Sequence, residues 1–518
     1  MKTRRALRNT AIQAGTQVAT WALSWVLLVM LPRYLGDDGF GTLFLALSYG
    51  MVLGTLMNLG INTYLAKQTA ILNPVDADDG PEKERREDEL RALLGEAVFL
   101  KLFLGFIVYG IMAGLVFVLP YDAETRHAIL IIGISVCLSG LTQTAGAGFQ
   151  GLEAMGAPNL ALIAEKVVLT VASVALLQMG YGLIPVCWVY VAAAAVNAGL
   201  SLVALRRKTR LRPRWNFSAV KGLLAGGLPF LIWIVAGEIY VRIDVLMLSF
   251  MAPESVVGWY GAAFRLYGTL LFVPHILNTA VFPPLARLGA DENDLAALGA
   301  ATRRVLNLLL LVSVPIAAGI ALAARPLVVL LYGAGPFEGS IVPLMIFGAC
   351  IVPVCVDTLL GSVLIARGRQ LAWSCMAIAA AVFNPLMNLW TIPLTQEMYG
   401  NGGIGAGAAT LLTELLMMAG ALWLMPKGVL SLGPVKTFLK AAVCAGLMAA
   451  VILLPGIRNL LPIVVVGAVT YGLAAVGLRV LPPEDLHHLL HALGMAGRFP
   501  RLERLLGIPP EKAGADEA

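Results

Sequence analysis

The stretch "LLAGGLPFLIWIVAGEIYVRIDVLMLSF", residues 223–250, is apolar along its length apart from Glu238, Arg242 and Asp244. A helix needs roughly 20 apolar residues to cross a bilayer, so this run is long enough to span a membrane. Of the whole 518-residue chain, 59% is hydrophobic and 13% is charged, about half of the ~25% charged residues typical of soluble domains. A surface with so little charge is expected to face lipid, and the sequence therefore predicts an all-α polytopic membrane protein.

Fourteen apolar segments are long enough to be transmembrane helices. They cover approximately residues 11–31, 40–64, 93–119, 128–149, 160–179, 183–205, 223–250, 257–283, 305–331, 341–366, 371–392, 404–425, 438–454 and 460–480. If the N-terminus is cytoplasmic, most lysines and arginines fall on the cytoplasmic side, and the opposite connections hold only Arg33, Arg126 and Arg458. This asymmetry predicts a multi-pass protein of the inner or plasma membrane with both termini in the cytoplasm.

The net charge of +6 does not indicate a nucleic-acid partner. The basic run "RRKTRLRPRWN", residues 206–216, lies between two expected spans, where it would face anionic membrane lipids. No nucleic acid is expected to bind this chain. The sequence also shows no soluble catalytic domain, nucleotide-binding loop or metal-ligand cluster, so we expect neither an enzyme nor a cofactor.

Two weak internal similarities suggest a repeat. "FGTLFLALSYG" from Phe40 resembles "YGAAFRLYGTL" from Tyr260, and "LEAMGAPNLA" from Leu152 resembles "LIARGRQLAW" from Leu364. Similar offsets in the two pairs predict two six-helix lobes of the same topology, with a binding site between them near the middle of the membrane. The predicted parts are an N-terminal lobe (1–208), a C-terminal lobe (209–426), two further helices (427–481) and a cytoplasmic tail (482–518).

The charged residues of the opening stretch are the main candidates for a binding site. Glu238 and Arg242 are four residues apart, so they share one helix face. Asp244 points elsewhere and would pair with Arg265 of the next expected span. Charge at bilayer depth costs several kcal/mol unless it is paired or hydrated, which makes it a candidate for function. The alternative is a structural ion pair that joins two helices.

Other polar residues within the expected spans complete the candidate cavity lining. They are His275, Asp357, Asn384, Glu414, Gln13 and Gln17. The two glutamines occupy one polar face of the first expected helix. No residue is expected to be catalytic or to bind a metal.

Several motifs resemble polysaccharide-biosynthesis flippases. They include "RNTAIQAG" at Arg8, "RYLGDDGFGTLFLA" at Arg33, "VVGWYGAAFRLYGTLLFVPHILNTAVFPPLARL" at Val256, "PLVVLLYG" at Pro326 and "NPLMNLWTIPLTQEMYGNGGIGAGAATLLTEL" at Asn384. The family is the Wzx-type branch of the multidrug/oligosaccharidyl-lipid/polysaccharide exporter superfamily. This resemblance implies a V-shaped transporter that moves a polyprenyl-diphosphate-linked oligosaccharide from the cytoplasmic to the outer leaflet by alternating access. Surface-polysaccharide polymerases and glycosyltransferases would be its functional partners.

Three alternatives remain open at the level of sequence. A lipid II flippase of the same superfamily would typically carry several arginines along its first, second and eighth helices, and the first expected helix here has none before Arg33 at its outer end. An ion-coupled multidrug exporter would use acidic groups such as Glu238, Asp357 and Glu414 for cationic drugs. A membrane scaffold would use none of these charges for transport. Because no nucleotide site is expected, coupling to H⁺ or Na⁺ would supply the energy for transport, unless the substrate's own gradient does.

Overall fold

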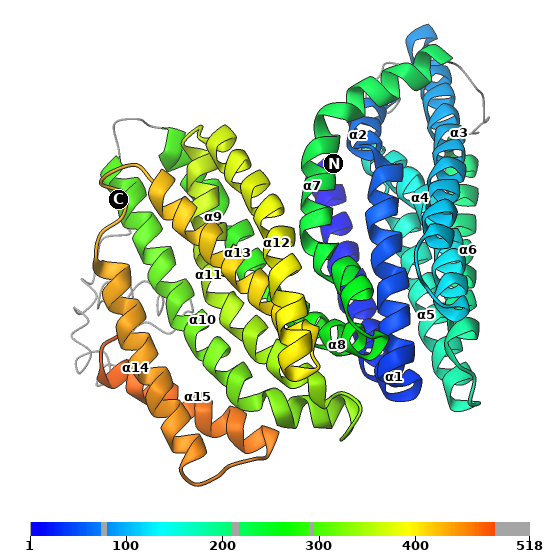
Figure 1. Ribbon diagram of the computed structural model, residues 1–518. Helices are drawn as coiled ribbons and strands as arrows, with labels where there is room; N and C mark the ends of the chain where they lie inside the picture. The colour runs from blue at the N-terminus through cyan, green and yellow to red at the C-terminus, as the bar shows by residue number, and fades with distance from the viewer. Residues whose placement is uncertain (1, 74–79, 210–216, 291–294, 482–518) are drawn as a thin grey trace. The chain divides into compact units, whose positions relative to one another are not determined.

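The computed structural model describes residues 2–73, 80–209, 217–290 and 295–481, and every regular element within these ranges is a helix (Figure 1). The helices are α1 (Lys2–Asn58), α2 (Ile61–Ile71), α3 (Pro81–Val118), α4 (Ala123–Gly151), α5 (Gly156–Gln178), α6 (Leu183–Thr209), α7 (Phe217–Met251), α8 (Glu254–Leu270), α9 (Phe272–Ala290), α10 (Leu295–Tyr332), the 3₁₀ helix η2 (Glu338–Ser340), α11 (Ile341–Ala366), α12 (Gln370–Tyr399), α13 (Gly402–Leu424), α14 (Gly433–Leu453) and α15 (Leu460–Gly477). The predicted tail, 482–518, lies outside the described residues.

Within the described residues, twelve helices are long and apolar enough to cross a membrane. Each of the fourteen predicted spans falls on these helices or on α7, so the prediction of an all-α polytopic membrane protein is confirmed. Large apolar side chains remain exposed along them, such as Phe106 at 81% and Trp423 at 83%. Exposed apolar area of this extent suits lipid rather than water.

Helix α1 contains two of the predicted spans because it bends sharply at Gly36. This glycine has φ 72° and ψ −178°, a combination that a residue with a Cβ rarely adopts. The part from Gly15 to Asn58 is 44 residues long, or about 66 Å at 1.5 Å per residue. That is about twice the hydrocarbon thickness of a bilayer, so the helix is long enough to cross twice.

The contacts of the described residues divide the chain into two compact units. Unit 1 comprises Met1–Gly261, Leu331–Pro336 and Ile392–Gly403, and unit 2 comprises Ala262–Leu330, Phe337–Thr391 and the chain from Ile404. Helix α7 packs on α1 and α2 within unit 1. This division differs from the predicted boundary between residues 208 and 209. The two six-helix lobes and the V shape stay sequence predictions.

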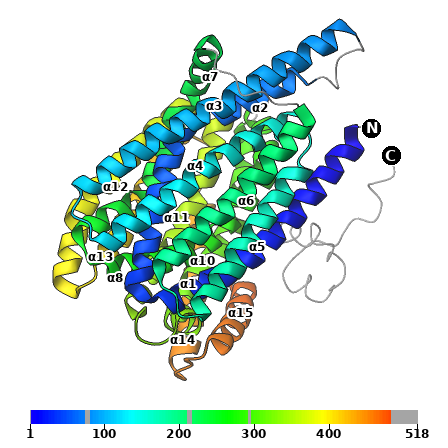
Figure 2. The same cartoon turned by 90° about the vertical axis from the view of Figure 1, so that its right-hand side faces the viewer.

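Unit 1 is a bundle in which α4 and α6 pack along each other and α5 packs against α6 and α1 (Figure 2). Its core joins apolar side chains such as Leu65, Leu94, Phe149 and Leu205 from α2, α3, α4 and α6. These side chains recur at helical spacing, which is why one face of each helix is buried.

A buried lysine supports the break between α1 and α2. Lys101 of α3 is 1% exposed, and its Nζ donates to the carbonyl oxygens of Met57 and Asn58 at 3.2 and 3.4 Å and to Asn58 Oδ1 at 3.1 Å. Leu59 and Gly60 follow with φ values of 47° and 70°. The last carbonyl groups of a helix lack intrahelical partners, and Lys101 supplies a donor to two of them.

Unit 2 contains two packed groups of helices that can be followed separately. Helices α9 and α11 pack closely, since a Cβ at Gly289 would lie 2.8 Å from the carbonyl oxygen of Ala366. Helices α14 and α15 lie side by side (Figure 1) and share a core with α10. There the hydroxyl of Tyr471 donates to the carbonyl oxygen of Leu311 at 2.9 Å. This contact ties the last described helix to the rest of unit 2.

Candidate functional site

The predicted pair on α7 forms as its spacing indicates. Arg242 Nε lies 3.5 Å from Glu238 Oε1, and the two side chains are 15% and 29% exposed. They lie in the second half of α7, well inside the apolar run. The pair therefore places a cation and a carboxylate within the apolar run, with both side chains partly exposed.

Asp244 is buried and accepts a hydrogen bond from α8. It is 3% exposed and its Oδ2 accepts a hydrogen bond of 2.7 Å from the hydroxyl of Tyr260 on α8. Asp244 and Tyr260 belong to unit 1, whereas Arg265 belongs to unit 2 and is half-buried. The pairing of Asp244 with Arg265 stays a prediction.

Asp357 and Glu414 come together in unit 2. Their side chains, on α11 and α13, are hydrogen-bonded to each other and are 6% and 9% exposed. An ionised carboxylate only accepts hydrogen bonds, so a bond between two carboxyl groups requires a proton on one of them. Thr358 Oγ1 also donates to Asp357 Oδ1 at 3.4 Å. The arrangement is a buried pair of carboxyl groups that can share one proton.

Tyr267 of α8 lies near this acidic pair. The carboxyl groups of Glu414 and Asp357 are among its neighbours. Its ring stacks on Phe347 of α11, with ring centres 4.9 Å apart and an interplanar angle of 11°. The ring contact fixes the tyrosine beside the carboxyl groups, so α8, α11 and α13 contribute to one polar cluster inside unit 2.

The remaining predicted residues are not joined to these pairs by a hydrogen bond or ion pair among the contacts described. Asn384 is buried on α12, where its Oδ1 accepts a bond of 3.0 Å from Asn388 one turn later. His275 is exposed on α9, and Gln13 and Gln17 are exposed on α1. These side chains can contact a ligand but do not by themselves form a site.

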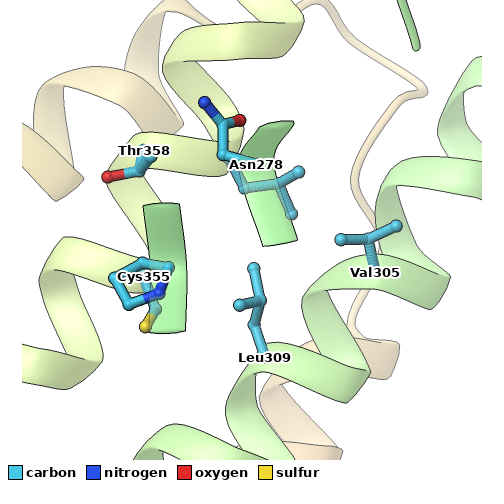
Figure 3. Close-up of a pocket in the computed structure, with 7 residues that line it drawn as sticks. Asn278, Val305, Leu309, Cys355 and Thr358 are labelled. Atoms are coloured by element: carbon cyan, nitrogen blue, oxygen red, sulfur yellow. The ribbon is translucent and has the colours of Figure 1, made fainter. Parts of the chain in front are cut away.

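A small cavity, with room for about one water molecule, lies between α9, α10 and α11 of unit 2 (Figure 3). The polar ends of Asn278 and Thr358 lie on one side of it, while Val305 and Leu309 lie opposite. Asn278 Oδ1 also accepts a bond of 2.7 Å from Ser362. Pockets for drug-sized ligands are far larger, so this cavity cannot hold an oligosaccharide.

The structure reveals a polar cluster in unit 1 that sequence reasoning missed. Glu165 and Lys166 lie in the middle of α5, and Asn197 and Ser201 face them from α6. Asn197 Nδ2 donates to Glu165 Oε2 at 2.5 Å. Residues 160–179 are so apolar overall that Glu165 and Lys166 were not considered as candidates. Two adjacent ionisable residues inside an expected span are nevertheless a recognisable sign of a functional site.

Within the described residues, no group of three or more histidine, cysteine, aspartate or glutamate side chains has the arrangement of a metal site. The candidate residues carry guanidinium, carboxyl and amide groups, which bind phosphates, protons and hydroxyl groups.

Two family models match the chain. The model described as "Polysaccharide biosynthesis protein" matches residues 6–289, and the model described as "Lipid II flippase MurJ" matches residues 159–471. The first of these covers more than half of the chain and includes α7 and the Glu238–Arg242 pair.

Two curated relatives are similar over about half of the chain. A probable flippase, AglR, from Haloferax volcanii is 27% identical over 262 residues, 48% of this chain and 53% of the relative. An O-antigen transporter, named as putative, from Shigella dysenteriae is 24% identical over 277 residues, 53% of this chain and 66% of the relative. The match thus spans about half of the first relative and about two thirds of the second.

Solved structures share the fold. A lipid II flippase MurJ in an inward closed conformation has a TM-score of 0.67, with 16% identity, over 91% of this chain and 99% of the other. An inward-facing multidrug resistance transporter of the MATE family has a TM-score of 0.60, with 14% identity, over 78% and 93%. The chain belongs to the polysaccharide biosynthesis protein family, in the Wzx-type branch of the multidrug/oligosaccharidyl-lipid/polysaccharide exporter superfamily.

Proposed function

We propose that this protein is a flippase that moves a polyprenyl-diphosphate-linked oligosaccharide from the cytoplasmic to the outer leaflet of the inner membrane. In this proposal both termini are cytoplasmic and the protein works by alternating access, without an enzymatic step. Membership of the polysaccharide biosynthesis family supports the substrate class, as do the flippase and O-antigen transporter among the relatives. Polymerases and glycosyltransferases of the same polysaccharide would act before and after it.

The observation that carries the proposal is Arg242, which lies inside the apolar run of α7. Its side chain is 15% exposed, and its Nε lies 3.5 Å from Glu238 Oε1. Arginine binds phosphate oxygens through two parallel hydrogen bonds, which suits a diphosphate head group. Arg265, half-buried on α8 of unit 2, is a second cation proposed to bind phosphate.

Translocation in proteoliposomes tests this function directly. The purified protein is reconstituted with the lipid-linked oligosaccharide fraction of the cells that carry it, and the exposure of the glycan on the opposite leaflet is followed. Arg242→Ala and Arg265→Ala at unchanged protein level should each slow the transfer, with Arg325→Ala, exposed and paired with Glu338 at 3.2 Å, as the control. Full transfer by both variants would rule out this site assignment.

In intact cells, deletion of the gene should trap the lipid-linked glycan on the cytoplasmic leaflet. Normal surface polysaccharide in the deletion strain would contradict the flippase. Sensitivity to cationic drugs in that strain would instead support the second candidate, an ion-coupled multidrug exporter. A lipid II flippase would show as arrested peptidoglycan synthesis.

The acidic pair Asp357–Glu414 is the observation that favours ion coupling. Two hydrogen-bonded carboxyl groups can release and take up one proton as their surroundings change. We propose that this pair couples transport to H⁺ in the flippase as well.

A further inference from the structure

The polar cluster on α5 and α6 has a feature that a purely structural ion pair does not need. Glu165 is held from one side: Asn197 Nδ2 donates to its Oε2 at 2.5 Å, and Ser201 Oγ donates to Asn197 Oδ1 at 3.0 Å. Asn197 and Ser201 are 3% and 0% exposed. This chain of hydrogen bonds fixes the position of the carboxylate from its buried side.

The other side of the carboxylate is open. Glu165 Oε1 lies 3.7 Å from Lys166 Nζ, which is longer than a good charge-assisted hydrogen bond of about 2.7–2.9 Å. The two side chains are 20% and 29% exposed. A donor and an acceptor thus lie side by side with unused hydrogen-bonding capacity.

This exposure does not face the lipid side of α5. Leu160, Val167 and Val171 are 68%, 41% and 62% exposed and mark that side. At about 100° per residue, Glu165 and Lys166 lie roughly 100–160° around the helix from these three residues. The pair therefore opens toward the inside of unit 1.

Helix α1 adds polar groups at the same level. Thr170, one turn after Lys166, donates from Oγ1 to the carbonyl oxygen of Leu23 at 3.4 Å. One turn before Leu23 on α1 lies Thr20, and one turn before that lies Thr16, both 6% exposed. The predicted topology has α1 and α5 running in the same direction. The hydroxyl groups of α1 then lie at the level of Lys166.

From this arrangement we infer that Glu165 and Lys166 form a subsite that binds hydroxyl groups of the transported glycan. This inference rests on the proposed function. It adds a contact for the glycan, whereas the arginines of α7 and α8 are proposed to bind phosphate. A sugar hydroxyl both donates and accepts hydrogen bonds, so it can bridge Glu165 Oε1 and Lys166 Nζ. The neutral total charge of the pair suits a hydroxyl-rich group better than a diphosphate, which would be repelled by the carboxylate.

Access of water is tested first, in protein whose six native cysteines are replaced by alanine. Leu162 is half-buried and lies one turn before Lys166, on the same side of α5 as the pair, so Leu162→Cys places a thiol beside the pair and leaves it intact. This thiol should react with a membrane-impermeant methanethiosulfonate reagent, whereas the matched Val171→Cys on the lipid side should not. A dry ion pair would leave both variants unlabelled, which would overturn the inference.

Ligand binding is tested by protection of that thiol in proteoliposomes. The two probes are the lipid-linked oligosaccharide fraction extracted from the cells that carry this protein and a polyprenyl diphosphate without sugar. The oligosaccharide fraction should slow labelling of the Leu162→Cys variant severalfold, the sugar-free lipid should not, and Lys166→Gln should abolish the protection. Equal protection by both lipids, or protection by neither, would overturn the subsite.

The result separates this inference from the proposed function. If the wild-type protein translocates the fraction but the fraction gives no protection, the subsite fails alone. If protection occurs without any translocation, the flippase proposal fails while the glycan contact stands.

Discussion

Gly41 of α1 and Gly258 of α8 lie backbone to backbone in unit 1. A Cβ built on Gly41 would come within 2.1 Å of the carbonyl oxygen of Glu254, and one built on Gly258 would come within 2.1 Å of the carbonyl oxygen of Asp37. The indole Nε1 of Trp259, next to Gly258, donates to Asp37 Oδ2 at 3.1 Å. Because neither glycine has a side chain, the backbones of α1 and α8 lie closer together here than they could with any other residue type at positions 41 and 258.

Substitution Gly41→Ala should destabilise the protein by about 1–3 kcal/mol or more, because the added methyl meets fixed backbone atoms. The measurement is thermal unfolding in detergent. Gly110→Ala is the matched control, since nothing lies within 4 Å of a Cβ there, and it should be neutral or slightly stabilising. Equal melting temperatures of the wild type and the Gly41→Ala variant would contradict the close packing.

Asp122 should make the stability of α4 depend on pH. Partial burial acts to raise the pKa of this carboxyl, but hydrogen bonds from Thr125 and from the backbone of Glu124 outweigh it, so the pKa is lowered below its ordinary value. A lowered folded-state pKa means that the stabilisation is present above the unfolded-state pKa and is lost as pH falls through the folded-state pKa. Asp122→Ala should cost about 1 kcal/mol at neutral pH and less at acidic pH.

The control for Asp122 is the asparagine variant. An asparagine side chain caps a helix nearly as well as aspartate at neutral pH, but it does not titrate, so Asp122→Asn should remove the dependence on pH. Unfolding curves that shift equally with pH in all three proteins would show that this cap does not contribute.

Lys101→Met should lower the free energy of unfolding by about 1–3 kcal/mol, because carbonyl groups at the end of α1 lose their buried donor. Methionine keeps most of the side-chain length, so the loss reports the hydrogen bonds at 3.1–3.4 Å rather than a cavity. Lys67→Met, at an exposed position on α2, should change stability by less than about 0.5 kcal/mol. If both variants unfold alike, the lysine does not support the helix break.

Glu414→Gln should uncouple transport from a pH gradient. Glutamine can keep the hydrogen bond to Asp357 but cannot release the shared proton. A gradient of one pH unit supplies about 1.4 kcal/mol per proton, so it should bias glycan transfer by the wild type by up to about tenfold and leave the variant unaffected. The assay is translocation in proteoliposomes with an imposed gradient, and Glu338→Gln is an exposed control. Retained gradient dependence in the Glu414→Gln variant would contradict proton coupling through this pair.

The sequence predicted the helices well because long apolar runs can be satisfied only as membrane helices. It also predicted the Glu238–Arg242 pair, since a separation of four residues fixes two side chains on one face. Contacts between helices were harder to predict from the sequence. No local pattern shows that Asp244 meets Tyr260, or that Asp357 meets Glu414 across 57 positions of the chain.

The second predicted repeat stays a prediction, but the turns after α4 and α11 can be compared with it. The alignment placed Gly156 opposite Gly368. In the structure the left-handed position at the turn after α4 is occupied by Glu153, and Gly368 occupies the corresponding position after α11. A non-glycine residue with φ 51° is uncommon, so a comparison guided by glycines pairs Gly368 with Gly156 rather than with Glu153.

Unit 1 is not contiguous in the chain, and this has a consequence for biosynthesis. Leu331 accepts a hydrogen bond of 2.6 Å from Arg33 Nε, and Pro336 accepts one of 2.6 Å from Trp259 Nε1; residues 392–403 also belong to unit 1. A nascent chain released into the membrane after α7 would still lack these segments. The first helices to leave the ribosome must therefore wait for more than a hundred later residues before unit 1 is complete. The yield of folded protein should then depend more on a chaperone or insertase that shields these helices during the interval than on how fast α1–α7 are translated.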